Sequence, residues 1–354
     1  MAAYQDHTWN EIHSQPEAWA AAQHEFAAQA DTIVGFLQEQ AYDQVLFIGC
    51  GSTYYLSLAA AAAYRAITGQ VAFGMPASEV WLNPDLVLPT GRTLLVPVSR
   101  SGATTETLRA VAAFRAAQAG PVLTLSCYAD QPLAQMGDLN LVFPSGQEQS
   151  IAQTRAFSTL YLATLEIAAL RAQRSDLQAG LACLPAACRD VLTQAGPLAR
   201  QLAANPALSR CYVLGSGLRY GLASEISLKL KEMSLSESEP FAFLEYRHGP
   251  QSMASPQTII IGFCSARHAT HEQAVLNEMG ALGATTVAIG VAVGVAIGTE
   301  QAAITLADLD DLIRGPLYLP FGQLLAYERA ILKGLDPDHP HQLSAVVRLE
   351  PAAH

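Results

Sequence analysis

The sequence predicts an α/β protein made of two copies of one unit, each a parallel sheet sandwiched between helices in three layers. Short apolar runs of strand length alternate with helical stretches, which is typical of a parallel sheet covered on both faces. A glycine turn follows such a run twice, at Gly49-Cys50-Gly51 and again at Gly215-Ser216-Gly217. At 354 residues the chain has room for two domains of ordinary size.

The first copy begins after a helical stretch over residues 1–40, which has spaced apolar anchors such as Trp9 and Trp19. A strand starting at Gln44 ends in a Gly/Ser/Thr turn and leads into a helix over Leu56–Ile67. The pattern recurs with a strand from Thr93 and a helix from Thr104 to about Gln118. Residues 122–126 and 139–143 add two further buried strands.

The second copy begins after the helical residues 154–204, which contain the expected boundary. We therefore expect an N-terminal helical segment at 1–40, a first domain at 41–190 and a second at 191–354 that includes the C-terminal tail. Arg210–Gly217 mirrors Gln44–Gly51 and precedes another long helix. The remaining elements are strands at 258–263 and 285–289 and a last helix that runs to Lys333. The most apolar run, 287–298, is too short to cross a bilayer and is interpreted as a buried strand plus a turn.

Composition excludes several classes of protein. Hydrophobic residues make up 51% of the chain and charged residues 14%, which supports a large core and gives no sign of disorder. The net charge of −11 argues against nucleic-acid binding and requires a local cradle for any phosphorylated ligand. The six scattered cysteines favour buried reduced thiols over a zinc site or disulfides. With a polar N-terminus that lacks a signal-peptide pattern, we expect a cytoplasmic protein with no membrane segment.

The sequence Ser99-Arg100-Ser101-Gly102-Ala103-Thr104 places three hydroxyls and an arginine around one glycine, directly before a helix. Helix starts suit anions because free N–H groups and the helix dipole meet there. Plain helix capping by Ser101 or Thr104 is the alternative. We favour phosphate binding, because one cap does not need four donors. The turn at Gly49–Gly51 alone is equally consistent with a tight crossover.

A second group of polar residues follows the second glycine turn. Lys229 and Glu232 are three residues apart and share a helix face, and Arg247-His248-Gly249-Pro250 follows. A carboxylate and an imidazole near cations suit the opening of a sugar ring and the movement of a proton. A surface ion pair and an ordinary turn histidine are the plain alternatives. We favour a catalytic role for Glu232 and His248.

These motifs together resemble a double SIS (sugar isomerase) protein, similar to the isomerase half of glucosamine-6-phosphate synthase. The matching segments are Cys50–Tyr54, Ser99–Thr104, Gly215–Gly217, Glu225–Glu232, Arg247–Pro250 and the tail Asp336–Ser344. The likeness covers nearly the whole chain. It implies two tandem SIS domains, each with a flavodoxin-like, three-layer sheet.

The resemblance also implies roles for individual residues. Ser99, Ser101 and Thr104, with the backbone of Arg100, would hold the sugar phosphate. The turn Cys50-Gly51-Ser52-Thr53 would contact sugar hydroxyls, and the tail with Ser344 would cover the substrate. Glu232 would shuttle a proton between C1 and C2, and Lys229 would polarise or orient the open-chain sugar. His248 would open the ring from the neighbouring subunit, which implies a homodimer. The family needs no metal or organic cofactor, so we interpret His339 and His341 as loop histidines.

Two departures from the synthase pattern bear on the reaction. Ala2 follows Met1 where the synthase has a nucleophilic cysteine, so we expect no ammonia to be drawn from glutamine. Ala345 stands where the synthase has a lysine that forms a Schiff base, and a methyl group cannot form an imine.

Four functions remain open. The first is an isomerase/deaminase that releases ammonia from glucosamine 6-phosphate or a close relative. The alternatives are a fructosamine-6-phosphate deglycase, a glutamine-independent synthase isomerase, and a non-catalytic sugar-phosphate sensor. The sensor is disfavoured because residues 1–40 are too short and not basic enough for a DNA-binding helix-turn-helix.

Overall fold

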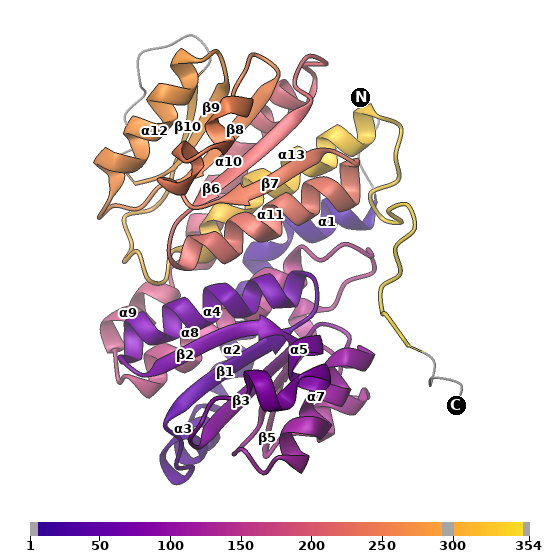
Figure 1. The fold of residues 1–354 in the computed structure, drawn as a ribbon, viewed down its shortest axis with the longest axis vertical. Helices are drawn as coiled ribbons and strands as arrows, with labels where there is room; N and C mark the ends of the chain where they lie inside the picture. Colours follow the sequence, from indigo (N-terminus) through magenta and orange to yellow (C-terminus); the bar gives the residue numbers. More distant parts are fainter. Residues whose placement is uncertain (1–5, 292–300, 350–354) are drawn as a thin grey trace. The chain divides into compact units, whose positions relative to one another are not determined.

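The computed structural model describes residues 6–291 and 301–349, and two parallel five-stranded sheets form its framework (Figure 1). The first has the order β2-β1-β3-β4-β5 and the second the order β10-β9-β8-β6-β7. With the strands renumbered within each half, both orders read 2-1-3-4-5. The prediction of a doubled three-layer α/β unit is therefore confirmed.

The residues divide into two compact units. The first unit comprises Ala18–Gln178 and the tail from Ser344, and the second comprises the chain up to Glu17 and Ala179–Leu343. The domain limits expected from the sequence stay a prediction. Each unit is described below by itself.

In the first unit, two helices cover each face of the sheet. Helices α4 and α8 pack together on one face, and α5 packs with α7 on the other. The strands are β1 (Gln44–Gly49), β2 (Val71–Pro76), β3 (Thr93–Ser99), β4 (Leu123–Ser126) and β5 (Leu139–Val142). The helices are α3 (Ala30–Glu39), α4 (Ser52–Thr68), α5 (Ala77–Leu82), α6 (Pro84–Val87), α7 (Thr105–Ala116) and α8 (Arg155–Arg171). Helices α2 (Gln15–Ala27) and α9 (Ser175–Leu181) lie where the chain passes between the units.

In the second unit, α11 packs on β6 and β7, α10 contacts β10, and α13 packs against both of these helices, whereas α12 packs on β8 and β9. The strands are β6 (Arg210–Gly215), β7 (Glu237–Phe241), β8 (Thr258–Phe263), β9 (Thr285–Gly290) and β10 (Gln301–Thr305). The helices are α1 (His7–His13), α10 (Leu184–Ala203), α11 (Leu218–Ser234), α12 (Ala269–Ala281) and α13 (Leu319–Leu332). Of the apolar run 287–298, β9 accounts for the start, and residues 292–298 lie outside the described residues.

The central strands explain why the sequence pattern worked. Every residue of β1, β3, β4, β8 and β9 is buried, and apolar residues dominate β1, β3 and β8. The edge strands β2 and β7 were not predicted from the sequence, because their side chains alternate between exposed and buried. Polar residues such as Glu237 and Glu239 interrupt the apolar signal there. The elements β10, α5, α6 and α12 were not predicted either.

The two glycine turns have the same backbone shape. Gly51 has φ 56° and ψ −122°, and Gly217 has φ 62° and ψ −129°. A Cβ on Gly49 would lie 2.4 Å from the backbone of Thr53, and one on Gly215 would lie 2.4 Å from that of Arg219. Each turn therefore needs glycine at both positions, and each opens a helix of 17 residues.

The strand registers equate the loops that follow β3 and β8. The pairs that define the registers are Ile48↔Pro97 in the first sheet and Leu214↔Gly262 in the second. Gly49 corresponds to Gly215, so the residues directly before them, Ile48 and Leu214, also correspond. Their partners on the neighbouring strands, Pro97 and Gly262, are therefore equivalent. Two residues later, Ser99 corresponds to Cys264.

Candidate functional site

Three hydroxyl groups converge in the loop between β3 and α7 of the first unit. The Ser99 and Thr104 hydroxyl oxygens lie 3.4 Å apart, and those of Ser101 and Thr104 lie 3.5 Å apart. Thr104 is the N-cap residue of α7, but its hydroxyl faces the two serines. The loop therefore gathers more hydroxyls than helix capping needs, as an anion cradle would.

The backbone of this loop depends on glycine. Gly102 has φ +65°, and a Cβ there would lie 3.0 Å from the Cβ of Gln131. The Gly102 N–H donates to the Ser99 hydroxyl at 3.2 Å, and the Ala103 N–H donates to that of Ser101 at 3.2 Å. The hydroxyls are thus held in place by the loop's own amides.

The side chain of Arg100 is committed elsewhere. Its guanidinium is buried and lies 3.3 Å from the Glu148 carboxylate. It also donates to the backbone oxygens of Ser150 at 3.1 Å and Ala345 at 3.2 Å. Glu148 neutralises the charge of the guanidinium, and the bond to Ala345 ties the tail to the loop. The side chain is therefore engaged within the protein, and the backbone of Arg100 is the part that could contact a ligand.

The first glycine turn uses one of its expected ligand groups internally. The buried Thr53 hydroxyl accepts the Cys50 N–H at 2.9 Å and donates to the Cys50 carbonyl at 3.0 Å. Ser52 is also buried, at the first position of α4. Burial raises the pKa of the Cys50 thiol to about 11, so this residue stays a neutral thiol. Substrate contacts by the turn stay a prediction.

The tail lies against the start of α7, and it forms a pocket with the loop before that helix and with the segments 128–131 and 148–150. The Thr105 N–H donates to the Val347 carbonyl at 3.3 Å, and the Leu349 N–H donates to the Thr105 hydroxyl at 3.1 Å. The pocket holds about 220 Å³. Its walls include Ser101, Gln131, Tyr128, Gln149, Ala345 and Arg348. Ser344 is exposed, and its hydroxyl donates to the Val346 carbonyl at 3.2 Å.

In the second unit, α11 carries a lysine between two carboxylates. Lys229 is fully buried, and its ammonium lies 3.3 Å from the Glu225 carboxylate and in direct contact with that of Glu232. Glu225 is also fully buried, whereas 19% of the Glu232 side chain is exposed. These three residues, the carboxylate–lysine cluster, are therefore no surface ion pair.

The electrostatics of the cluster favour charged groups. Burial alone lowers the pKa of Lys229, but the charges of Glu225 and Glu232 outweigh it, and the pKa lies above its usual value. Lys229 is therefore an ammonium at neutral pH. It fixes Glu232, the one member of the cluster that solvent or a substrate can reach.

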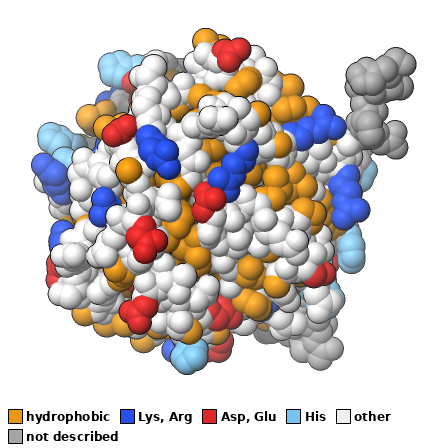
Figure 2. Space-filling model, turned by 90° about the horizontal axis from the view of Figure 1, so that it is seen from below, with side chains coloured by type: hydrophobic (Ala, Val, Ile, Leu, Met, Phe, Trp, Pro, Cys, Tyr) orange, Lys and Arg blue, Asp and Glu red, His pale blue; other side chains and the backbone are white. Residues whose placement is uncertain are grey.

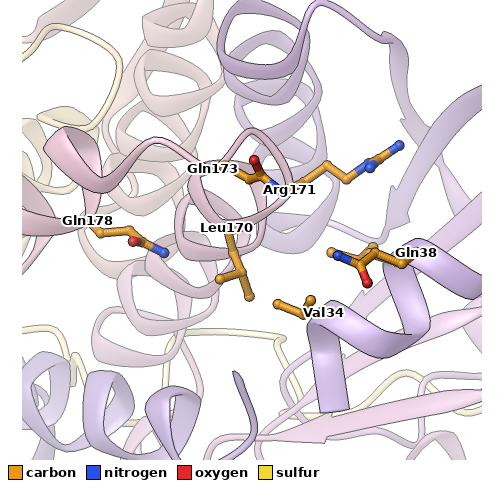
Figure 3. Close-up of a pocket in the computed structure, with 7 residues that line it drawn as sticks. Val34, Gln38, Leu170, Arg171, Gln173 and Gln178 are labelled. Carbon is orange, nitrogen blue, oxygen red and sulfur yellow. The ribbon is translucent and has the colours of Figure 1, made fainter. Parts of the chain in front are cut away.

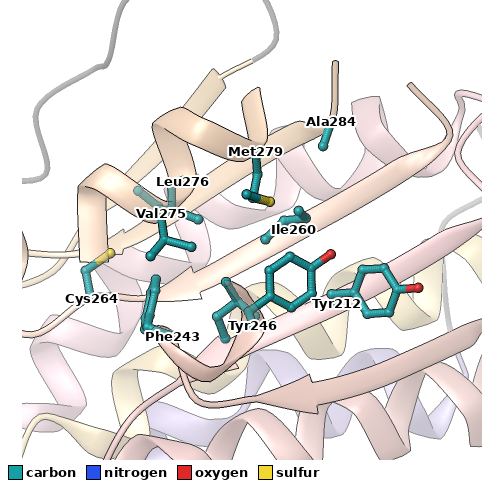
Figure 4. Close-up of a cluster of buried hydrophobic side chains, with 11 residues drawn as sticks. Tyr212, Phe243, Tyr246, Ile260, Cys264, Val275, Leu276, Met279 and Ala284 are labelled. Atoms are coloured by element: carbon teal, nitrogen blue, oxygen red, sulfur yellow. The ribbon is translucent and has the colours of Figure 1, made fainter. Parts of the chain in front are cut away.

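His248 lies in an exposed turn whose base is firmly anchored. Phe243 and Tyr246 are buried in an apolar cluster with Tyr212, whose ring centroid lies 5.5 Å from that of Tyr246 (Figure 4). The Phe243 N–H donates to the Ser216 hydroxyl of the glycine turn at 3.1 Å. The His248 N–H closes the turn on the Glu245 carbonyl at 3.0 Å. Buried residues at the foot of the turn thus hold an exposed imidazole in place.

The structure brings the predicted residues together as two groups. Ser99, Ser101 and Thr104 share one loop of the first unit, and the pair Lys229 and Glu232 lies in the second, as does His248. That these groups form one active site stays a prediction. Glu225 and Arg348 were not predicted from the sequence as site residues. The spacing of Glu225, four residues before Lys229 on the same helix, was a signal that could have found it.

A second cavity in the first unit does not resemble a ligand site. It holds about 260 Å³ and lies between α3 and the end of α8, with three glutamines in its walls (Figure 3). Arg171, which borders it, donates to Gln70 at 3.3 Å, just before β2, so this cavity lies at the amino ends of the strands. Ligands in such sheets bind at the carboxyl ends.

The remaining surface and thiols add little. On the face in Figure 2, Lys and Arg side chains lie scattered among acidic and apolar ones. Four cysteines are buried as expected, but Cys183 is exposed and Cys50 half-buried. Within residues 6–291 and 301–349, no cluster of three or more His, Cys, Asp or Glu side chains could hold a metal.

In the part of the chain that the structure describes, no helix is both long and apolar enough to cross a bilayer.

Curated proteins match this chain over nearly its whole length. The glutamine–fructose-6-phosphate aminotransferase (isomerizing) of Chlamydia caviae is 28% identical over 369 residues, which cover 98% of this chain and 59% of that protein. This chain thus spans little more than half of the curated relative.

Solved structures match over the whole fold. Glucosamine-6-phosphate deaminase from Thermotoga maritima is 26% identical, with a TM-score of 0.81 and coverage of 97% of this chain and 100% of that one. Tagatose-6-phosphate ketose/aldose isomerase from Escherichia coli has a TM-score of 0.84 at 23% identity, with coverage of 97% and 99%. The latter similarity concerns the fold alone.

The SIS domain family matches twice, once in each half of the chain. The matched residues are 40–171 and 208–311, and each match contains one of the two glycine turns described above. These matches cover more than half of the sequence and agree with the doubled fold. The chain belongs to the SIS domain family.

Proposed function

We propose that this chain is a phosphosugar isomerase that deaminates an amino-sugar phosphate, glucosamine 6-phosphate or a close relative. The observation that carries the proposal is the carboxylate–lysine cluster, in which a buried ammonium holds one reachable carboxylate, Glu232. Relatives with related chemistry in their names support it, namely an isomerizing aminotransferase and a glucosamine-6-phosphate deaminase.

In this proposal the cradle binds the phosphate and leaves the sugar carbons to the acid–base groups. Ser99, Ser101 and Thr104 donate hydroxyl protons to the phosphate oxygens. His248 moves a proton between the ring oxygen and the C1 hydroxyl, which opens the ring. The Glu232 carboxylate then removes the C2 proton while the aldehyde oxygen at C1 takes up a proton, which gives an enolamine. The enolamine takes the first proton back at C1 as its nitrogen gives one up.

The nitrogen leaves by hydrolysis. Proton transfer from C2 to C1 converts the amino aldose into a ketimine with its C=N bond at C2. Water adds to this carbon, the C–N bond breaks, and ammonia leaves with the proton it needs. The products are a ketose phosphate and ammonia. Ala345 cannot form an imine with the sugar, but this direction needs no such imine, because the substrate already carries its nitrogen.

The proposal includes a homodimer. His248 is exposed in this chain, on a loop whose base is buried with Phe243 and Tyr246. An exposed imidazole on a fixed base suits delivery to a neighbouring subunit. We propose that each His248 serves the site of the partner chain.

An assay of ammonia release tests the reaction. Purified protein is incubated with glucosamine 6-phosphate, galactosamine 6-phosphate and mannosamine 6-phosphate, and both ammonia and ketose phosphate are measured. Equal amounts of the two products from at least one substrate are expected. Ketose formation from an aldose phosphate without nitrogen, and no ammonia from any hexosamine phosphate, would reduce the proposal to a simple isomerase.

A second candidate, a fructosamine-6-phosphate deglycase, is favoured by the tail pocket. Ala345 stands where the synthase has a lysine, and its small side chain leaves room in the pocket. The exposed Arg348 adds a positive charge to the pocket walls. A substituent on the sugar nitrogen that ends in a carboxylate would fit this combination. The deglycase would release an amino acid where the deaminase releases ammonia.

Arg348 provides the test of this alternative. For a deglycase, Arg348→Ala raises the KM for a fructosamine 6-phosphate with a carboxylate substituent by about tenfold, the value of one charged hydrogen bond. Its KM for glucosamine 6-phosphate stays unchanged. If wild-type protein leaves all fructosamine phosphates intact, this candidate is excluded.

A further inference from the structure

The second unit contains a loop that corresponds to the cradle, but its own chain fills it. By strand register, Ala266 corresponds to Ser101 and Arg267 to Gly102. The Ala266 N–H donates to both Asp311 carboxylate oxygens, at 3.2 and 3.1 Å, and the Arg267 N–H donates at 3.4 Å. A carboxylate thus occupies the place that a phosphate would take in the first unit.

Two arginines surround the same carboxylate. Arg314 is 1% exposed and forms an ion pair with Asp311, and an Arg219 nitrogen lies 3.9 Å from the same carboxylate oxygen. Burial raises the pKa of Asp311, but the Ala266 N–H and the two guanidiniums outweigh it, and the pKa is lowered. Asp311 is therefore a carboxylate at neutral pH.

One carboxylate does not satisfy two guanidiniums. Arg314 Nε, Arg314 Nη1 and Arg219 Nε are buried and have no hydrogen-bond partner among the described residues. Buried guanidinium donors are costly when unpaired. The surroundings of Asp311 therefore have a surplus of cationic donors, as a site for a doubly charged oxyanion would.

The two loops differ in what holds their amides. In the first unit the Gly102 N–H bonds a neutral hydroxyl of Ser99. An incoming phosphate can replace or share such a weak partner. In the second unit the amides bond a charged group that belongs to the chain and cannot diffuse away.

We propose that the loop 264–268, together with Arg219 and Arg314, is a second oxyanion site whose resident ligand is the carboxylate of Asp311. Inorganic phosphate and related oxyanions occupy this site once the carboxylate is removed. The native chain therefore has one open oxyanion loop and one that it fills itself. This proposal is independent of the catalytic assignment, because no substrate chemistry enters it.

The test removes the internal ligand in a background without the first cradle. Asp311→Ala is made together with Ser101→Ala and Thr104→Val, and phosphate binding is measured by calorimetry and by the change of Tm with phosphate concentration. The matched control is Asp308→Ala in the same background, which removes an exposed carboxylate three residues away.

The expected result is phosphate binding at least about tenfold tighter in the Asp311 variant than in the Asp308 control, since charged hydrogen bonds are regained. The Tm of the Asp311 variant also rises with phosphate. Selenate soaked into its crystals should give an anomalous peak beside the Ala266 N–H. A folded Asp311 variant whose Tm and phosphate affinity equal those of the control overturns the proposal.

Asp311→Asn covers the case in which the alanine variant does not fold without phosphate. The amide keeps the shape of the side chain but leaves both guanidiniums without a counter-charge. Folding of the alanine variant only in phosphate, or a phosphate-dependent rise in Tm of the asparagine variant, supports the site. A flat response of the asparagine variant contradicts it. Failure of the ammonia assay would leave these results unchanged.

Discussion

The two units of this chain share one backbone plan but place their polar residues differently. Both have strands in the order 2-1-3-4-5, a glycine turn after the first strand, and a 17-residue helix after that turn. In the first unit the hydroxyls gather after the third strand in sequence, at Ser99–Thr104. In the second unit, Ser265 is the only hydroxyl residue of the corresponding loop, 264–269. There the carboxylate–lysine cluster lies on α11, the helix that follows the glycine turn.

The difference shows what the fold dictates and what it leaves free. Backbone geometry requires glycine at the turns of both units, because a side chain would collide or be strained there. It does not require Glu232, whose counterpart on α4 lies in an alanine-rich stretch. In the second copy the Ser265 hydroxyl and N–H bond the buried Glu272 at 3.0 and 2.6 Å, so even its one serine serves the local structure. The same plan thus carries the proposed ligand contacts in one copy and internal bonds in the other.

Glu232→Gln is expected to have the largest effect on activity, because it removes the proposed catalytic base from the second unit. We expect kcat to fall by about 10²–10⁴-fold, the usual contribution of general acid–base catalysis, with little change in Tm. The measurement is the initial rate of ketose phosphate formation. Glu239→Gln, the same change at an exposed position on β7, is the control. Full activity of Glu232→Gln would show that the base lies elsewhere.

Lys229→Met is expected to act on stability. It leaves the fully buried Glu225 without its counter-charge, which costs about 3–5 kcal/mol of unfolding free energy. Urea unfolding measures the loss. Adding Glu225→Gln should restore part of it, and Lys231→Met, at an exposed position on the same helix, should change little.

The pH dependence of the Lys229→Met effect follows from the raised pKa of Lys229. A raised pKa means that the ion pairs stabilise the fold fully below the ordinary lysine pKa of about 10.4. The stabilisation is lost as the pH rises through the folded-state value. The difference between wild type and Lys229→Met should therefore be constant from pH 7 to 9 and shrink above about pH 10.4. A difference that shrinks below pH 9 would contradict a raised pKa.

Ser101→Ala with Thr104→Val tests the hydroxyl side of the comparison. Loss of two hydrogen bonds to a phosphate should raise the KM about 10–100-fold, while kcat changes little because the reacting carbons are elsewhere. Steady-state kinetics separates the two constants. Thr270→Val, in the first turn of the corresponding helix α12, is the control and should leave both constants unchanged. A fall in kcat at constant KM would place these hydroxyls near the chemistry.

The sequence predicted those features whose signal is local. Continuous apolar strands and the two glycine turns identified the doubled fold, and motif spacing identified the hydroxyl loop and the carboxylate–lysine helix. Edge strands were missed because only one face of β2 and β7 is buried. The pairing of Arg100 with Glu148 could not be predicted, since the two are 48 residues apart and no local pattern links them. The same holds for Asp311, which reaches Ala266 over 45 residues.

The smallest effects test the part of the plan that both units share. Gly51→Ala and Gly217→Ala should each cost about 1–3 kcal/mol of unfolding free energy, because both positions have φ near +60° and a ψ that only glycine adopts readily. The reference is Gly35→Ala within α3, where an added Cβ also meets nothing within 4 Å but the backbone is helical. That change should stabilise the protein by about 0.5–1 kcal/mol. Since space is equally free at all three sites, opposite signs in urea unfolding isolate the backbone angle as the cause. Equal losses at Gly51 and Gly217 would show that the two turns are strained alike, and a clearly larger loss at one would mean that the two copies are less alike than their dihedral angles indicate.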